Sequence, residues 1–202
     1  MEEVINFHGN CVFKTSSSYI PSEVEKDFIS NLEYQNIKDN LHYVSKNVNV
    51  LDNSTCNNLA NMLDNYADYY IKNLLEIDHK LKRLNSWVTI NKKGSFHDIH
   101  KHTNTFISVC FYPQIKEGGI IFTSSPLISS KTNLNFKNIK DNIFNCNKLN
   151  MKISPNDIII FPGWLNHTGE ENTHDLDRVM IGVNYFITGN LGTNNSVNNL
   201  NL

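Results

Sequence analysis

The chain has 202 residues, of which 40% are hydrophobic and 19% are charged, and its formal net charge at pH 7 is −2. This length and this balance predict one folded domain and exclude a disordered or fibrous chain. The near-neutral charge and the absence of a polybasic tract argue against a protein that binds nucleic acid.

The sequence shows no pattern typical of a membrane span or an export signal. No apolar run approaches the length needed to cross a bilayer, and the acidic N-terminus lacks the apolar segment of a signal peptide. The four cysteines are widely spread and form no C-x-x-C pair, which makes a zinc ribbon or a disulfide framework improbable. We therefore expect a cytoplasmic protein with reduced thiols.

Residues 1–84 are expected to form a mostly helical layer that supports the rest of the domain. Two short strands are predicted at residues 4–7 and 11–13, and Ser22 is a candidate N-cap for a helix that follows it. Residues 54–84 carry the clearest helical pattern, because apolar residues recur at steps of three and four without Gly or Pro.

After residue 85 the apolar residues recur at every second position, which indicates β-strands. The predicted strands are short and are bounded by Gly, Pro, Asn and Ser, as in an all-β sandwich or barrel. They cover residues 87–91, 105–112, 119–123, 149–154, 157–161 and 178–187. We expect a single domain over residues 1–187 with its β core at 85–187. A long loop at 124–148 and a flexible tail at 188–202 are also predicted.

The histidines predict a metal site. On an extended segment the side chains of His100 and His102 point to the same face, so both imidazoles can reach one metal ion. His167 follows the predicted strand 157–161 and a Pro-Gly turn, and can supply a third ligand from another strand. Three protein ligands leave open positions for a cosubstrate and dioxygen, which is the arrangement of mononuclear non-haem iron oxygenases.

The ligand set has one alternative. The usual iron site of this kind has two histidines and one carboxylate, but here His102 holds the position where the carboxylate is expected. Asp98 lies two residues before His100 and is the rival ligand, and His97 and Asp98 are otherwise expected close to the site. A histidine in place of a carboxylate makes the site one charge more positive, which favours an anionic cosubstrate.

Arg178 is the candidate residue for binding that anion. It begins a predicted strand whose other face is apolar, so its guanidinium either enters a pocket or lies at the exposed start of the strand. A buried guanidinium needs a carboxylate partner, and a ligand carboxylate held by a bidentate fork is a natural one. Asn91, Ser108 and Asn184 are weaker candidates for further hydrogen bonds to the same ligand.

These residues resemble a family of small iron(II)/2-oxoglutarate oxygenases. The resemblance covers residues 85–187 closely and the N-terminal part loosely. It rests on the segment from Gly94 to Ser108, the Pro155–Pro162 strand, His167, and Arg178 with Asn184. The chain differs from the family pattern at Thr103, Val109 and Met180, where the family has Pro, Gly and Ser.

The resemblance implies a double-stranded β-helix, or jelly roll, with helices on its N-terminal side. It implies that Arg178 binds the distal carboxylate of 2-oxoglutarate beside an Fe(II) ion. The implied reaction uses dioxygen to hydroxylate a substrate, and releases succinate and CO2. The substrate, a small molecule or a protein side chain, is not indicated by the sequence, and a homodimer is possible.

Two other functions fit the same residues. A three-histidine dioxygenase of the cupin type would bind its own substrate at the iron and use Arg178 for a substrate carboxylate. A non-catalytic metal-binding module would keep only the fold and the ion. A zinc hydrolase is disfavoured, because no Asp or Glu stands where a general base usually accompanies the histidines.

Overall fold

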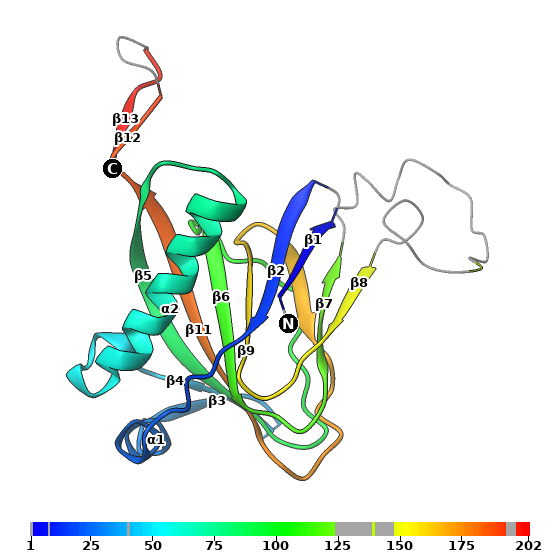
Figure 1. Ribbon diagram of the computed structural model, residues 1–202. Coiled ribbons are helices and arrows are strands. Elements are labelled where there is room, and N and C mark those ends of the chain that lie inside the picture. Colours follow the sequence, from blue (N-terminus) through cyan, green and yellow to red (C-terminus); the bar gives the residue numbers. More distant parts are fainter. Residues whose placement is uncertain (1, 8, 40, 124–138, 140–147, 193–196) are drawn as a thin grey trace.

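The computed structural model describes residues 2–7, 9–39, 41–123, 139, 148–192 and 197–202. The described chain is built around two antiparallel sheets, as expected for a mainly β jelly roll. The larger sheet contains eight strands in the order β1-β2-β9-β6-β11-β5-β4-β3, and the smaller one contains β10-β7-β8. Figure 1 shows α2 on one side of the large sheet and β7 and β8 on the other.

The strands of the large sheet are β1 Glu3–Phe7, β2 Asn10–Ser16, β3 Tyr34–Lys38, β4 His42–Ser45, β5 Lys80–Asn91, β6 Ile107–Gln114, β9 Asp157–Pro162 and β11 Arg178–Thr188. The smaller sheet consists of β7 Gly119–Thr123, β8 Lys148–Lys152 and β10 Asn166–Gly169. The helices are α1 Glu23–Ser30 and α2 Asn57–Tyr69, with the 3-10 turns η1 Val50–Asp52 and η2 Ser54–Cys56, and the π-helical turn η3 Tyr70–Leu74.

The large sheet buries both of its faces because its central strands are apolar at almost every position. On β6, Val109 and Phe111 belong to the core on the α2 side, whereas Cys110 and Tyr112 face the small sheet. Successive strand residues point to opposite faces, so one strand supplies both cores. The predicted strands in residues 85–187 are confirmed, and a cavity lies between the two sheets.

The expectation that residues 1–84 are mostly helical needs correction. Strands β1 and β2 extend one end of the large sheet, and β3 and β4 extend the other. The residues of β3 are mostly exposed and include few strong β-formers, so pairing with β4 at the sheet edge decides their conformation. The N-cap prediction is confirmed, since Ser22 forms a capping box with Glu25.

The long helix ends earlier than its apolar spacing predicts. The helical path stops at Leu74, and residues from Lys80 onward form β5, although the sequence pattern predicts helix up to residue 84. The cause is tertiary, because β5 pairs with β11 along its length, from Thr188 opposite Lys80 to Arg178 opposite Asn91.

The ends of the described chain show one further difference. Within the predicted tail, β12 Asn190–Leu191 and β13 Leu200–Asn201 pair as a small hairpin after β11. Gly189 turns the chain there with a φ of +102°, a conformation that glycine adopts without strain. The loop predicted at 124–148 lies mostly outside the described residues. No helix in the described part of the chain has both the length and the apolar character to span a membrane.

Candidate metal centre and active-site cavity

The structure brings His100, His102 and His167 together. His100 and His102 lie in the connection from β5 to β6, and His167 lies on β10. His100 and His167 exchange two backbone hydrogen bonds, of 3.0 and 2.9 Å, and the His102 amide donates to the Gly163 carbonyl at 2.8 Å. One ligand atom from each histidine lies within 4.8 Å of the other two, so the group can hold a metal ion.

Hydrogen bonds fix how two of the rings point. The Nδ1 atom of His100 lies 2.8 Å from the Asp98 carbonyl, and that of His167 lies 2.9 Å from the Leu165 carbonyl. A carbonyl oxygen only accepts, so Nδ1 carries the proton in both rings and Nε2 keeps a free lone pair. This is the usual arrangement of metal-binding histidines, whose second nitrogen donates to the protein.

His102 is held by side chains of the large sheet. Its Nδ1 atom lies 2.6 Å from the Ser108 hydroxyl and 2.8 Å from the Asn184 Oδ1 atom, and the Ser108 hydroxyl donates to Asn184 at 2.8 Å. Ser108 and Asn184 therefore lie behind the ring and outside the cavity lining. Their expected contacts with the cosubstrate stay predictions, and in the structure their oxygens accept from His102.

Burial keeps the three imidazoles neutral. It lowers the pKa of His167 to about 3 and that of His102 to about 4, and the neighbouring His100 adds to both shifts. The pKa of His100 is also lowered by burial. The Nε2 atoms of His100 and His102 lie 3.2 Å apart. With Nδ1 protonated in both rings, neither Nε2 has a proton to share, so the donor set fits a divalent cation bound by nitrogen.

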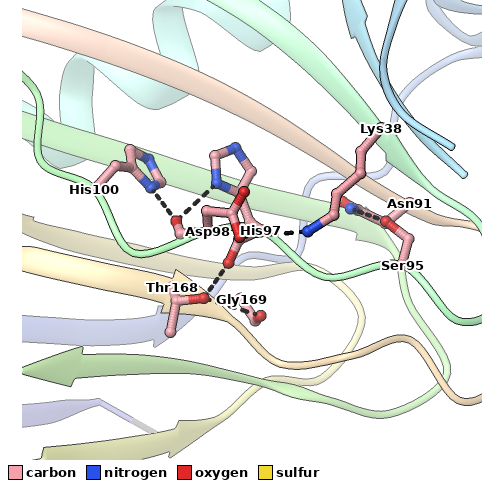
Figure 2. Close-up of polar contacts among 8 residues, drawn as sticks. All are labelled: Lys38, Asn91, Ser95, His97, Asp98, His100, Thr168 and Gly169. Carbon is pink, nitrogen blue, oxygen red and sulfur yellow. Dashed lines mark hydrogen bonds and ion pairs between the residues drawn. The ribbon is translucent and has the colours of Figure 1, made fainter.

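The rival ligand Asp98 points away from the three histidines. Its carboxylate pairs with Lys38 at 3.5 Å and is 76% exposed. Figure 2 shows that its backbone carbonyl accepts from both His97 and His100, at 3.2 and 2.8 Å. The His97 ring lies beside that of His100, with ring centroids 4.2 Å apart, and lines the cavity. Asp98 thus acts on the site through its main chain.

A cavity leads from the histidines to Arg178, and no Asp or Glu lines it among the described residues. The Arg178 side chain is only 4% exposed. Its Nη2 atom donates to the Glu170 carbonyl at 2.5 Å, but no carboxylate within the described ranges forms an ion pair with it. Burial lowers the pKa of Arg178, which nevertheless stays charged at neutral pH. Of the two locations considered for Arg178, the structure shows the cavity and not the exposed start of the strand.

Several lining residues were not predicted as site residues. Trp87 and Thr89 share a face of β5 with Asn91, and the alternation along residues 87–91 could have identified them. Asn91 lines the cavity, and its amide already donates to Ser95 at 2.8 Å. Trp87 packs directly against Gly182, where a Cβ atom would lie 2.4 Å from the indole ring.

The family model described as putative 2OG-Fe(II) oxygenase matches residues 85–184 of this chain. That range contains the three histidines, Arg178, the whole small sheet, and strands β6 and β9 of the large sheet with parts of β5 and β11. Residues 85–184 belong to this oxygenase family. The protein is therefore an Fe(II)- and 2-oxoglutarate-dependent oxygenase. A search of curated proteins finds no match.

Solved structures share the fold of this oxygenase. A 2OG-Fe(II) oxygenase family oxidoreductase from Burkholderia pseudomallei is 10% identical with a TM-score of 0.60, over 86% of this chain and 83% of that one. HygX from Streptomyces hygroscopicus, solved with nickel and 2-oxoglutarate, is 10% identical with a TM-score of 0.59, over 86% of this chain and 82% of that one. A Pseudomonas putida prolyl-4-hydroxylase is 8% identical with a TM-score of 0.54, over 89% of this chain and 94% of that one. At such identities the likeness supports the fold alone.

Proposed function

We propose that His100, His102 and His167 hold the Fe(II) ion of this oxygenase and that Arg178 binds the distal carboxylate of 2-oxoglutarate. When bound, the iron activates dioxygen for the hydroxylation of a substrate C–H bond, with release of succinate and CO2. We further propose that residues 1–187 form one oxygenase domain, since β1 to β4 pair into the same sheet as the core strands.

The buried guanidinium of Arg178 is the observation that carries this proposal. The Glu170 carboxylate attracts Arg178 but forms no salt bridge with it, so a ligand carboxylate is the natural close partner of this buried cation. A divalent ion on three neutral imidazoles adds two positive charges to a cavity without lining Asp or Glu among the described residues. Together with Arg178, the ion gives the cavity three positive charges. The two carboxylates of a dicarboxylate such as 2-oxoglutarate compensate two of them.

The binding test uses the anaerobic Fe(II) protein titrated with 2-oxoglutarate, whose chelation to iron gives a charge-transfer absorption band. Arg178→Gln should raise the Kd for 2-oxoglutarate about 10- to 100-fold, the value of a charge-assisted hydrogen bond. Arg178→Lys should have a Kd between those of the unmodified protein and Arg178→Gln, because lysine keeps the positive charge but loses the two parallel donors of the guanidinium. Arg83→Lys is the matched control. Arg83 is the only other arginine of the chain, lies on β5 and pairs with Asp64, so this variant should bind 2-oxoglutarate normally.

The metal assignment is tested separately by metal content after anaerobic loading. His100→Ala and His167→Ala should retain little iron, whereas His174→Ala should retain it, since His174 pairs with Glu117 away from the cavity. Iron binding without any response to 2-oxoglutarate would contradict the cosubstrate assignment. If such a protein still consumed dioxygen with a chelating substrate, it would be a three-histidine dioxygenase of the cupin type.

The substrate is proposed only by class, as a small molecule or an exposed side chain that reaches the cavity. The expected cytoplasmic location and a homodimer stay predictions. Sedimentation of the purified chain would test the second.

A further inference from the structure

The hydroxyl of Thr89 is a buried polar group without a partner. The residue is 1% exposed, and its Oγ1 atom has no hydrogen-bond partner within the part of the chain that the structure describes. A buried hydroxyl that forms no hydrogen bond is costly, so such groups are usually satisfied by a ligand or a bound water. Three other buried side-chain atoms share this property, but only Thr89 lines the active-site cavity.

The position of Thr89 links it to Arg178. In the pairing of β5 with β11, Thr89 lies directly opposite Met180, and the next pair on the same face is Asn91 with Arg178. Both Met180 and Arg178 also line the cavity. Met180 offers only a thioether, a weak acceptor. Thr89 is therefore the nearest hydroxyl on β5 to the arginine across the strand pair.

Trp87 lies on the side of Thr89 that is opposite to Arg178 along β5. It is two residues before Thr89 on the same face, and its ring meets that of His102 edge-on at a centroid distance of 5.4 Å. Thr89 thus lies between the metal end and the arginine end of the cavity. A ligand that spans the two ends therefore passes beside Thr89.

We propose that Thr89 is a binding residue for the cosubstrate, and that its hydroxyl donates a hydrogen bond to the same distal carboxylate that Arg178 binds. This inference rests on the proposed function and extends it to a second residue of the carboxylate pocket. The cavity has no lining carboxylate among the described residues that would compete for the hydroxyl proton. Asn91 lines the same cavity, and its amide donates one hydrogen bond to Ser95.

The test compares Thr89→Val, which has the same shape but no hydroxyl, with Thr89→Ser, which keeps the hydroxyl. In the anaerobic titration with 2-oxoglutarate, Thr89→Val should raise the Kd about tenfold, and Thr89→Ser should stay within about twofold of the unmodified protein. Thr15→Val, at a buried threonine of β2 that does not line the cavity, is the control and should bind normally.

Thermal unfolding of the metal-free, ligand-free protein gives a readout independent of turnover. Because the hydroxyl has no partner there, Thr89→Val should not lower the unfolding midpoint, although it weakens ligand binding. A lower midpoint would mean that the hydroxyl has a structural partner, and would overturn the inference.

A comparison with 2-oxobutyrate, which lacks the distal carboxylate, identifies the end of the ligand that Thr89 contacts. The Thr89→Val effect should be present for 2-oxoglutarate and absent for 2-oxobutyrate. An equal effect on both acids, or normal binding of 2-oxoglutarate by Thr89→Val, would overturn the role of Thr89. Failure of the unmodified protein to bind 2-oxoglutarate, or no effect of Arg178→Gln, would instead refute the proposed function itself.

Discussion

At the scale of single residues, His102 depends on the two oxygens behind it. Ser108 and Asn184 accept from its Nδ1 atom, at 2.6 and 2.8 Å, and so turn its Nε2 atom toward the other imidazoles. Partners of this kind fix both the tautomer and the direction of a metal-binding histidine. A neutral histidine at this position gives a metal centre one unit more positive than one with a carboxylate ligand.

The contact between Asn184 and His102 gives a residue-scale prediction. Asn184→Ala should lower the metal affinity about 10- to 100-fold, the usual effect of removing the partner of a ligand histidine. Asn184→Asp keeps an accepting oxygen and should retain most of the affinity. Titration with a competing chelator measures both. Equal loss in the two variants would contradict a role for the acceptor at Asn184.

The sequence could identify the cluster of three histidines but not the network behind it. His100 and His102 are two apart on an extended segment, and that spacing alone places both side chains on one face. Ser108 and Asn184 are polar residues on strands, and the alternation shows their face but not their partner. Whether they meet a ligand or His102 depends on the path of residues 92–104, which no local pattern encodes.

At the scale of elements, α1 is a short helix whose N-terminus is defined by one capping box. The Ser22 amide donates to the Glu25 carboxylate at 2.7 Å, and the Glu25 amide donates to the Ser22 hydroxyl at 3.3 Å. The helix contributes the buried side chain of Ile29 to the core on the α2 side of the large sheet. The capping box therefore helps to hold Ile29 in place at the edge of that core.

Ser22→Ala should lower the free energy of unfolding by about 1 kcal/mol, because an orphan helix amide loses its acceptor. Ser30→Ala is the control, since Ser30 lies in the last turn of the same helix and caps no free amide. Denaturant unfolding of both variants measures the difference. If the two substitutions cost the same, the capping box does not stabilise α1.

The elements also show why helix ends and edge strands were hard to predict. Apolar residues after Leu74 continue at helical spacing, yet β5 begins at Lys80 because β11 offers it a full row of backbone partners. The strands β3 and β4 were not predicted, since Tyr34–Lys38 contains mostly polar residues. Both outcomes depend on pairing between segments far apart in sequence, which outweighs local propensity.

At the scale of the whole molecule, five of the seven histidines that the structure describes have a lowered pKa, mainly because of burial. The five are His42, His97, His100, His102 and His167. Three of them lie in the metal cluster and the other two beside it, with the His42 and His97 rings 4.7 Å apart. The cluster joins the loop after β5 to the small sheet, so its protonation affects how the two sheets meet.

Acid should therefore destabilise the metal-free protein. In the unfolded chain a histidine takes up its proton near pH 6.5, but the folded values are about 4 for His97 and about 3 for His167. The unfolded state binds more protons between these values, so the free energy of unfolding should fall as the pH drops from 7 to 5. Denaturant unfolding across this range measures the slope.

His167→Asn removes one of these groups and should make the slope shallower. An unchanged slope would show that the buried imidazoles do not govern the acid response of the fold.

The packing of Gly182 against Trp87 restricts how the chain can diverge. A Cβ atom at position 182 would lie 2.4 Å from the indole that meets His102. A lineage that carries this tryptophan cannot accept a larger residue at 182 until position 87 has first become smaller. The two sites should therefore change in a fixed order, and relatives that have made the change should have lost the indole beside the metal centre.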